Sequence, residues 1–559
     1  MKKGLFFVLL LALFVALIGG VVGAQDEPKV LVTGRQMGSS DIPTIDPALA
    51  EDVPSVQVID ELFVGLVRIN EETAAAEPGM ATGWTVSDDG LTYTFSIRPD
   101  VPWVRYNAGS GAVEQLTDAD GNPMFVTAQD FAYGILRALS PETASPYLYV
   151  YQPWIAGGLA YASGEGAMED VAIRAVDDLT LEVTMARASS VTLLIFGMWG
   201  FMAQPQSIID EYAEFWIDPE NIATYGPFAL KEWVRGDGGS LTMIKNPLWP
   251  ASDNVPSPKI DEVQFVFLDD TVQLTNFEAG SLDVAEVPGT EIDRVRASAE
   301  LSAAYAVSPG TCTYYYGFNV EREPFTDARA RLAFSMAIDR SGITEDVLGA
   351  GEIPANFFAL PSLNAAPVLA QFPEGGVFSD AEGARALWDE YLADVGKTSA
   401  DFNLTLFHND SAVHSAIAQA IQQMWSETLG VTVQIATADF STYLDTRGNY
   451  DVYRAGWCYD YPDAHNFYYD AGFHSDLLAE NDTHWSNADY DALVEQGFSA
   501  ATVEERIDLY AQAEQILVHD DPAMAPIYYY VTDDLTAPGI TRTYSNITRE
   551  HYEKWDINR

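Results

Sequence analysis

The chain has 559 residues, of which 48% are hydrophobic and 12% aromatic. This composition predicts a folded protein with enough core for several domains, and it excludes an intrinsically disordered chain. The formal net charge is −53, from 82 acidic and 29 basic residues. Such a charge argues against nucleic acid or an anionic membrane surface as the main partner.

The first residues have the pattern of a secretory signal peptide. Lys2 and Lys3 precede an uncharged apolar stretch over 5–22, and polar residues follow a small-residue cleavage site. We therefore predict a signal peptide over 1–24 and an exported protein, periplasmic or on the cell surface. An uncleaved membrane anchor is the alternative. Because no cysteine lies near the cleavage site, a lipoprotein is not expected.

Hydrophobic spacing beyond the signal predicts strands and helices that interleave along the chain. In chain order they are a strand at 29–33, a helix at 55–68, a strand at 92–97, an exposed excursion at 105–124, a helix at 127–139, strands at 179–185, 228–233 and 260–268, a helix at 325–338, a strand at 402–407, a helix at 414–429, a strand at 431–435, a helix at 503–518 and a strand at 526–531. This order predicts an α/β or α+β protein in several lobes.

One acid lies within an aromatic segment. Asp460 is flanked by Tyr459 and Tyr461 and follows Trp457 closely, so its carboxylate is expected to be poorly hydrated. A buried carboxylate needs a cationic partner or several hydrogen-bond donors to remain ionised. The neighbouring sequence has no lysine, which leaves a ligand ammonium as a candidate partner. An acid that caps a turn is the alternative interpretation.

Cys312 and Cys458 are the two cysteines of the chain. In an exported protein two cysteines can form one disulfide, and closing so long a loop would contribute about 4–5 kcal/mol in the loop-entropy model. Two free buried thiols are the alternative.

Motifs of known catalytic chemistry are missing from the sequence. There is no GxSxG, HExxH, GxGxxG or phosphate-binding loop, and the seven histidines show no metal-ligand spacing. We therefore expect neither enzymatic activity nor a cofactor or metal, and a hydrolase is the weakest reading.

Several motifs carry a resemblance to a known family. They are Thr-Ile-Asp-Pro at 44–47, LTYTFSIR at 91–98, VTAQDF at 126–131, YGPFALKEW at 225–233, CTYYY at 312–316, PFTDAR at 324–329, LDTR at 444–447 and RAGWC at 454–458. From about residue 29 to its end, the chain resembles the extracytoplasmic solute-binding proteins of peptide and nickel ABC importers (family 5), above all the members that bind oligopeptides. The spacing of the two cysteines agrees with that family.

The resemblance implies a set of ligand-binding positions. Asp460 matches an aspartate that pairs with the α-ammonium of the peptide. Arg454, Arg447 and His414 match residues that meet the C-terminal carboxylate of peptides of increasing length. The other matching positions line the cleft, and they are Glu51, Val53, Tyr147, Trp457, Cys458, Phe440 and Tyr530. Phe440 replaces a tryptophan, and two residues are missing between Arg447 and Arg454, which alters the reach of Arg447.

The resemblance also implies a periplasmic-binding-protein-like type II fold of three lobes. Lobe I would comprise 25–72, 206–311 and 528–559, lobe II would be inserted at 73–205, and lobe III would be 312–527. A ligand cleft would lie between the two main lobes.

The implied function is the capture of an oligopeptide by hinged closure of the cleft. The implied partners are the permease and ATPase subunits of an ABC importer, with the binding protein itself a monomer. The same fold could instead bind a dipeptide, murein peptide, oligosaccharide or metal chelate. A peptide-sensing receptor that feeds no transporter is a further alternative.

Overall fold

The computed structural model describes residues 28–559 except 36, 39–40, 237 and 501. The predicted signal peptide over 1–24 lies outside the described residues. Among the residues that are described, none of the helices combines the length and the apolar character needed to cross a bilayer.

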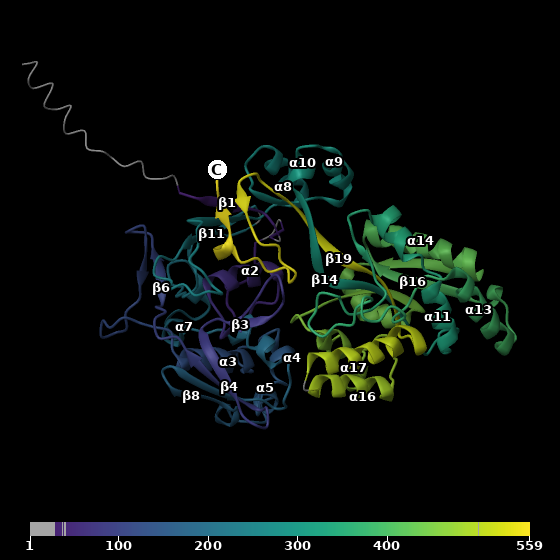
Figure 1. Cartoon of the computed structure of the whole chain (residues 1–559), viewed down its shortest axis with the longest axis horizontal. Coiled ribbons are helices and arrows are strands. Elements are labelled where there is room, and N and C mark those ends of the chain that lie inside the picture. The colour runs from purple at the N-terminus through teal and green to yellow at the C-terminus, as the bar shows by residue number, and fades with distance from the viewer. Residues whose placement is uncertain (1–27, 36, 39–40, 237, 501) are drawn as a thin grey trace, which may run out of the picture.

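A mixed 11-stranded sheet runs through the molecule (Figure 1). Across the sheet its strands are β10 (Phe228–Val234), β11 (Ser240–Lys245), β12 (Glu262–Val266), β1 (Val30–Thr33), β13 (Val284–Glu286), β19 (Met524–Thr536), β14 (Tyr305–Phe318), β18 (Val452–Cys458), β16 (Asn403–Asn409) and β17 (Thr432–Ala438), with β15 (Ile353–Pro354) beside β19. Parallel and antiparallel pairs both occur, which confirms the α/β class.

Smaller sheets surround this one. A four-stranded sheet has the order β4 (Ala81–Val86), β5 (Thr92–Ile97), β9 (Thr180–Thr184) and β8 (Ile173–Asp177). The two-stranded pairs are β2 (Val67–Ile69) with β3 (Ala76–Pro78), β6 (Val104–Asn107) with β7 (Ala112–Gln115), and β20 (Ile540–Thr541) with β21 (Asp556–Ile557).

Helices pack against both halves of the structure (Figure 1). They are α2 (Val53–Leu62), α3 (Ala128–Leu139), α4 (Leu148–Tyr151), α5 (Gly158–Ala162), α6 (Thr192–Ile195), α7 (Gln206–Tyr212), α8 (Asp270–Glu278), α9 (Ile292–Ala297), α10 (Leu301–Ala304), α11 (Ala328–Met336), α12 (Arg340–Gly342), α13 (Ala381–Val395), α14 (Ala412–Leu429), α15 (Phe440–Thr446), α16 (Ala488–Ser499) and α17 (Val503–Gln515).

Local sequence explains several of these elements. The strand predicted at 92–97 is β5, and α3 begins directly after Thr127, whose side chain and backbone exchange hydrogen bonds with Asp130 as a capping box. The helix predicted at 55–68 is too long, because α2 ends at Leu62 and the chain turns into β2. Both segments are buried, so apolar spacing alone could not separate them.

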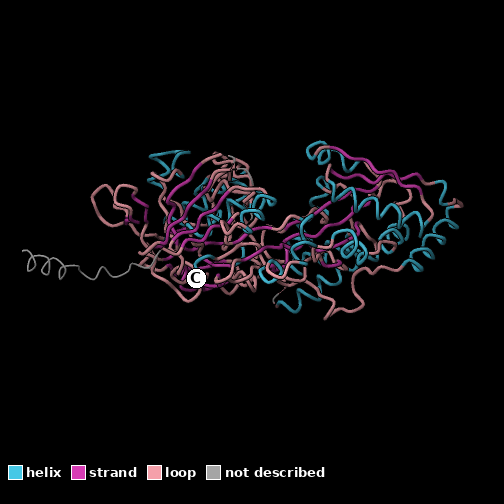
Figure 2. Tube along the Cα trace, turned by 90° about the horizontal axis from the view of Figure 1, so that it is seen from above, coloured by secondary structure: helices cyan, strands magenta, loops and turns pink. Residues whose placement is uncertain are grey.

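Two long strands join the halves of the 11-stranded sheet. β14 and β19 have 14 and 13 residues and pair antiparallel from Tyr305–Leu535 to Gly317–Met524. Figure 2 shows strands passing between the two halves of the molecule. The pairing is interrupted between Pro309 and Thr313, and a Cβ on Gly310 would lie 2.7 Å from the Tyr530 carbonyl oxygen. Glycine therefore permits the close approach of the two backbones here.

The predicted lobe boundaries at 312 and 528 fall inside these two strands. A division at β14 and β19 would make the strand pair the connection about which two bodies move. We retain the three lobes as a proposal.

The disulfide between Cys312 and Cys458 is confirmed. The two residues lie opposite each other at the end of the β14–β18 pair. The bond therefore fastens the end of β18, and Asp460 follows two residues later.

A buried ion pair anchors the chain beyond this point. Arg506 Nη2 and Nη1 donate to the two Asp463 carboxylate oxygens at 2.5 and 2.9 Å, and both side chains are fully buried. Asn364 Nδ2 donates to Asp463 Oδ2 at 2.8 Å. The fork geometry satisfies both carboxylate oxygens, which offsets much of the cost of burying the charges.

We expect Asp463→Asn to destabilise the protein by about 3–5 kcal/mol, because Arg506 would keep a buried charge without a counter-charge. Urea unfolding, monitored by tryptophan fluorescence, measures the loss in the free energy of unfolding. The matched control is Glu182→Gln, which breaks a pair with Arg174 whose side chains are 35% and 65% exposed. This control should lose less than about 1 kcal/mol, and equal losses in the two variants would contradict the assignment.

Candidate functional site

A cavity of about 200 Å³ lies where several distant parts of the chain meet. These parts are the segment around the start of α2, Tyr147, Trp199, Thr311, the end of β18 with the two residues that follow it, and residues 547–549. The lining residues are Glu51, Asp52, Val53, Val56, Tyr147, Trp199, Thr311, Cys458, Tyr459, Asp460, Ile547, Thr548 and Arg549. Five of the predicted site residues are therefore brought together here, namely Glu51, Val53, Tyr147, Cys458 and Asp460.

Asp460 is held in the cavity wall by uncharged donors. Its Oδ1 accepts hydrogen bonds from the hydroxyls of Tyr147 at 3.0 Å and Tyr149 at 3.4 Å, and its Oδ2 accepts one from Asn466 Nδ2 at 3.0 Å. Burial raises the pKa of Asp460 above its ordinary value, although these hydrogen bonds oppose the shift. Within the described part of the chain, no cationic side chain forms an ion pair with it.

A second acid lies behind Asp460. Asn466 Nδ2 also donates to Asp470 Oδ2 at 2.9 Å, and the Tyr461 hydroxyl donates to the same oxygen at 2.6 Å. Burial raises the pKa of Asp470 to about 7, and the nearby Asp460 charge adds to the rise. One amide group therefore bridges two carboxylates that share a poorly hydrated environment.

Sequence reasoning missed several of these contributors. Tyr149 and Arg549 come from segments far from Asp460, so no local pattern marked them. Asn466 and Asp470 lie within ten residues of Asp460, and this closeness in sequence was the one feature that could have suggested contact with it. Nothing distinguished Asp470 from the other acids of so acidic a chain.

Arg454 lies near the middle of β18 without an acidic partner among the described residues. Its Nη2 donates to the Tyr530 hydroxyl at 2.8 Å, and its guanidinium stacks on the Tyr314 ring at 4.9 Å. Arg454 precedes Asp460 by six residues, which limits the separation of their Cα atoms to about 20 Å even along a fully extended chain.

His414 belongs to the same neighbourhood. Its ring packs on Tyr314 with 5.6 Å between centroids, and its Nδ1 is buried without a hydrogen-bond partner in the described structure. Burial lowers the pKa of His414 to about 4, and the charge of Arg454 contributes to the shift. The imidazole is therefore neutral at physiological pH and presents one donor and one acceptor.

The other predicted residues lie outside the cavity lining. Arg447 Nε already donates to Asp482 at 2.6 Å, whereas Arg454 has no acidic partner among the described residues. Phe440 begins α15 and is 58% exposed. Trp457 donates through Nε1 to Asn466 Oδ1 at 2.9 Å, which positions the amide that holds Asp460.

This arrangement suits binding through charge and hydrogen bonds. The cavity wall offers the carboxylates of Asp460, Glu51 and Asp52. It also offers the guanidinium of Arg549, which pairs with Asp60 at 3.3 Å. His474, Asp476 and Glu495 form the one group near enough to share a metal ion in the portion of the chain that is described, and none of them lines the cavity.

Comparisons with known proteins place the chain in a family. The family model for bacterial extracellular solute-binding proteins, family 5 (middle), matches residues 75–477. The chain is 30% identical over 539 residues to the periplasmic oligopeptide-binding protein OppA of Escherichia coli, over 93% of this chain and 92% of that protein. It is also 30% identical over 509 residues to the probable deoxycholate-binding periplasmic protein YgiS of the same organism, over 90% and 89%.

A solved structure agrees with this assignment. The periplasmic murein tripeptide-binding protein MppA, in its unliganded open form, matches with a TM-score of 0.78 and 29% identity, over 95% of this chain and 98% of that one. The fold is therefore the periplasmic-binding-protein-like fold of these relatives. By sequence and by structure, the chain belongs to the bacterial extracellular solute-binding proteins of family 5.

Proposed function

We propose that this protein binds oligopeptides outside the cytoplasm and delivers them to an ABC importer. The proposal rests on the surroundings of Asp460. This carboxylate lies in the cavity wall, and the described residues give it only uncharged hydrogen-bond donors. A peptide α-ammonium would supply the missing positive charge through a charge-assisted hydrogen bond. Glu51 and Asp52 in the same wall add to the negative potential that favours a cationic group.

The other end of the peptide would meet Arg454. Its guanidinium has no acidic partner among the described side chains and can grip a carboxylate bidentately. Neutral His414 would donate one hydrogen bond to the same group in peptides of suitable length. Arg447 is already paired with Asp482, so its use would require that ion pair to open.

The backbone between the two ends offers donors and acceptors in every peptide. Edge strands or bridging water can satisfy them without reading side-chain identity. Closure of the two main lobes on the ligand would then present a closed form to the permease and ATPase subunits. We propose that the protein carries out no chemical step on the ligand. We also propose that it is a monomer and that its N-terminus carries no lipid.

The family alone does not choose the ligand, because one relative is named for deoxycholate and others for peptides. An anionic ligand in this cavity would meet three acids, Asp460, Glu51 and Asp52, and one guanidinium, that of Arg549, which is already paired with Asp60. Like charges disfavour binding, so the cavity favours a ligand with a cationic end.

We expect Asp460→Asn to weaken binding of free tri-, tetra- and pentapeptides by about 2–5 kcal/mol, which is about 30-fold or more. Calorimetric titration of refolded, ligand-stripped protein measures the affinity. N-acetylation of the peptides should weaken their binding to the wild type by a similar factor and should change their affinity for the variant little. The acetylation and the substitution each remove the same charge pair. The matched control is Asp508→Asn, an exposed aspartate on α17. Wild-type protein that binds acetylated and free peptides equally would contradict α-ammonium capture.

Affinity for free peptides should fall as the pH is lowered from about 8 to 5. Burial raises the pKa of Asp460 above its ordinary value and that of Asp470 to about 7, so Asp470 takes up a proton in the ligand-free protein as the pH falls through about 7. An ammonium favours the ionised carboxylates, so binding releases protons and weakens with acidity. Calorimetry in buffers of different ionisation enthalpy counts the protons, and Asp470→Asn should flatten the dependence near pH 7. Affinity that increases on acidification would oppose this assignment.

We expect Arg454→Gln to weaken binding of peptides with a free C-terminus by at least about tenfold, and to affect C-terminally amidated peptides much less. A length series of both peptide forms identifies which lengths reach Arg454. Arg174→Gln, at an exposed arginine, is the control and should leave every affinity unchanged. Equal losses for free and amidated peptides would remove Arg454 from carboxylate binding.

A further inference from the structure

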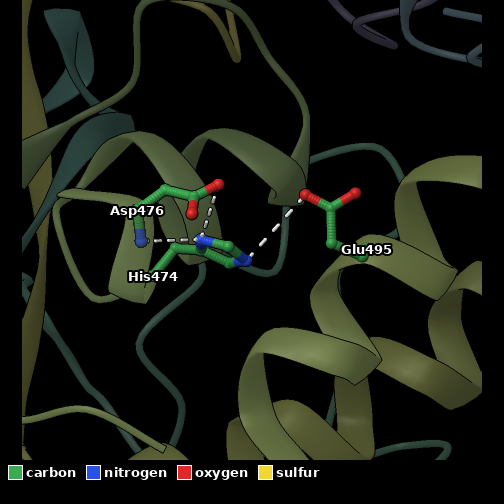
Figure 3. A group of neighbouring side chains, drawn as sticks. All are labelled: His474, Asp476 and Glu495. Carbon is green, nitrogen blue, oxygen red and sulfur yellow. Dashed lines mark hydrogen bonds and ion pairs between the residues drawn. The ribbon is translucent and has the colours of Figure 1, made fainter. Parts of the chain in front are cut away.

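His474 is surrounded by carboxylates at a point outside the peptide cavity. Figure 3 shows its ring between Asp476, which follows it in the chain, and Glu495 on α16. Its Nδ1 is 3.6 Å from Asp476 Oδ2, and its Nε2 is 3.9 Å from Glu495 Oε1. Asp491, one turn before Glu495 on the same helix, brings Oδ1 to 4.0 Å from Nε2.

The Nε2 atom of His474 carries the argument. The His474 residue is only 4% exposed, and within the described structure Nε2 has no hydrogen-bond partner. The atom points toward two carboxylates that are too far away for a hydrogen bond. A buried polar atom left in this way needs a partner, and a cation between Nε2 and the carboxylates would supply it.

The separations are close to those around one metal ion. Zinc binds histidine nitrogen and carboxylate oxygen at about 2.0–2.2 Å in tetrahedral geometry, so two such ligands lie about 3.3–3.6 Å apart. The distances of 3.9 and 4.0 Å from Nε2 to Glu495 and Asp491 exceed that spacing by about 0.3–0.7 Å, which small rotations of the two acidic side chains can close. The two acids are four residues apart and share one face of α16, so both can approach an ion placed against Nε2.

The surroundings supply the supporting contacts of a metal site. His474 Nδ1 accepts a hydrogen bond from the Asp476 backbone N–H at 3.3 Å. A metal ion at Nε2 would place the imidazole proton on Nδ1, so this bond would give way to one donated to the Asp476 carboxylate, whose Oδ2 lies 3.6 Å from Nδ1. Arg187 Nη1 lies 3.4 and 3.3 Å from the two oxygens of Glu495. An ionised carboxylate has about four lone-pair sites, so Glu495 can contact both the guanidinium and an ion.

We propose that His474, Glu495 and Asp491 bind a divalent transition-metal cation of the zinc class, with Asp476 orienting the histidine ring. A nitrogen donor favours zinc over calcium or magnesium, which prefer oxygen ligands. The ion would fasten the 474–476 segment to α16. This site is separate from the peptide cavity, and the proposal does not depend on the ligand bound there.

Calorimetric titration of chelator-treated full-length protein with zinc chloride, in the presence of millimolar magnesium, tests the proposal. Magnesium occupies the weak carboxylate sites expected on so acidic a surface. The wild type should bind one equivalent of zinc. Because loss of even an outer partner of a metal ligand costs about 10- to 100-fold in affinity, His474→Gln and Glu495→Gln should each weaken binding by more than about tenfold. Asp489→Asn, an exposed acid on the same helix, is the matched control and should bind as the wild type does.

Thermal unfolding provides a second readout, because a ligand of the native state raises the midpoint temperature. Zinc should raise the midpoint of the wild type and of Asp489→Asn, and it should not raise that of Glu495→Gln. Glu495 is 41% exposed, so this variant tests the site even if His474→Gln fails to fold. Equal zinc binding by all variants, or no zinc equivalent in the wild type, would overturn the proposal.

Discussion

The antiparallel pairing of β14 with β19 is the constraint on which the rest of the molecule depends. These strands connect β13 and the strands beyond it to β18, β16 and β17. β14 also pairs with β18, and the Cys312–Cys458 disulfide fastens the end of that pair. Asp460 follows directly, so the register of three strands fixes where its carboxylate meets Tyr147. A slip of one residue would turn the side chains of β14 to the opposite face of the sheet.

Two aspartates three residues apart show how environment separates structure from function. Asp463 is fully buried and receives both arms of the Arg506 guanidinium, so its charge is satisfied within the protein. From the described residues Asp460 receives only hydroxyl and amide donors, and burial raises its pKa. Asp463 holds the segment in place, while Asp460 has no counter-charge among the described residues. A ligand that brings a positive charge can supply one.

The overall charge of the chain supports the same preference. A net charge of −53 creates a negative potential that attracts cationic groups and repels anionic ones. This long-range effect is weak at physiological ionic strength, since it is screened beyond about 8 Å. In the proposed function, selectivity would therefore arise from the buried groups around Asp460 and Arg454, where solvent and salt screen least.

The sequence by itself determined the class of fold, the position of several elements and the family resemblance, because these depend on local spacing and short motifs. The strand at 92–97 and the cap at Thr127 are examples. Only the tertiary structure decided which charges are already satisfied. Tyr147 reaches Asp460 across 313 residues of chain, and Arg447 pairs with Asp482 rather than standing free. Burial and partner choice depend on contacts between distant segments, and in a chain with 82 acids no local pattern reveals them.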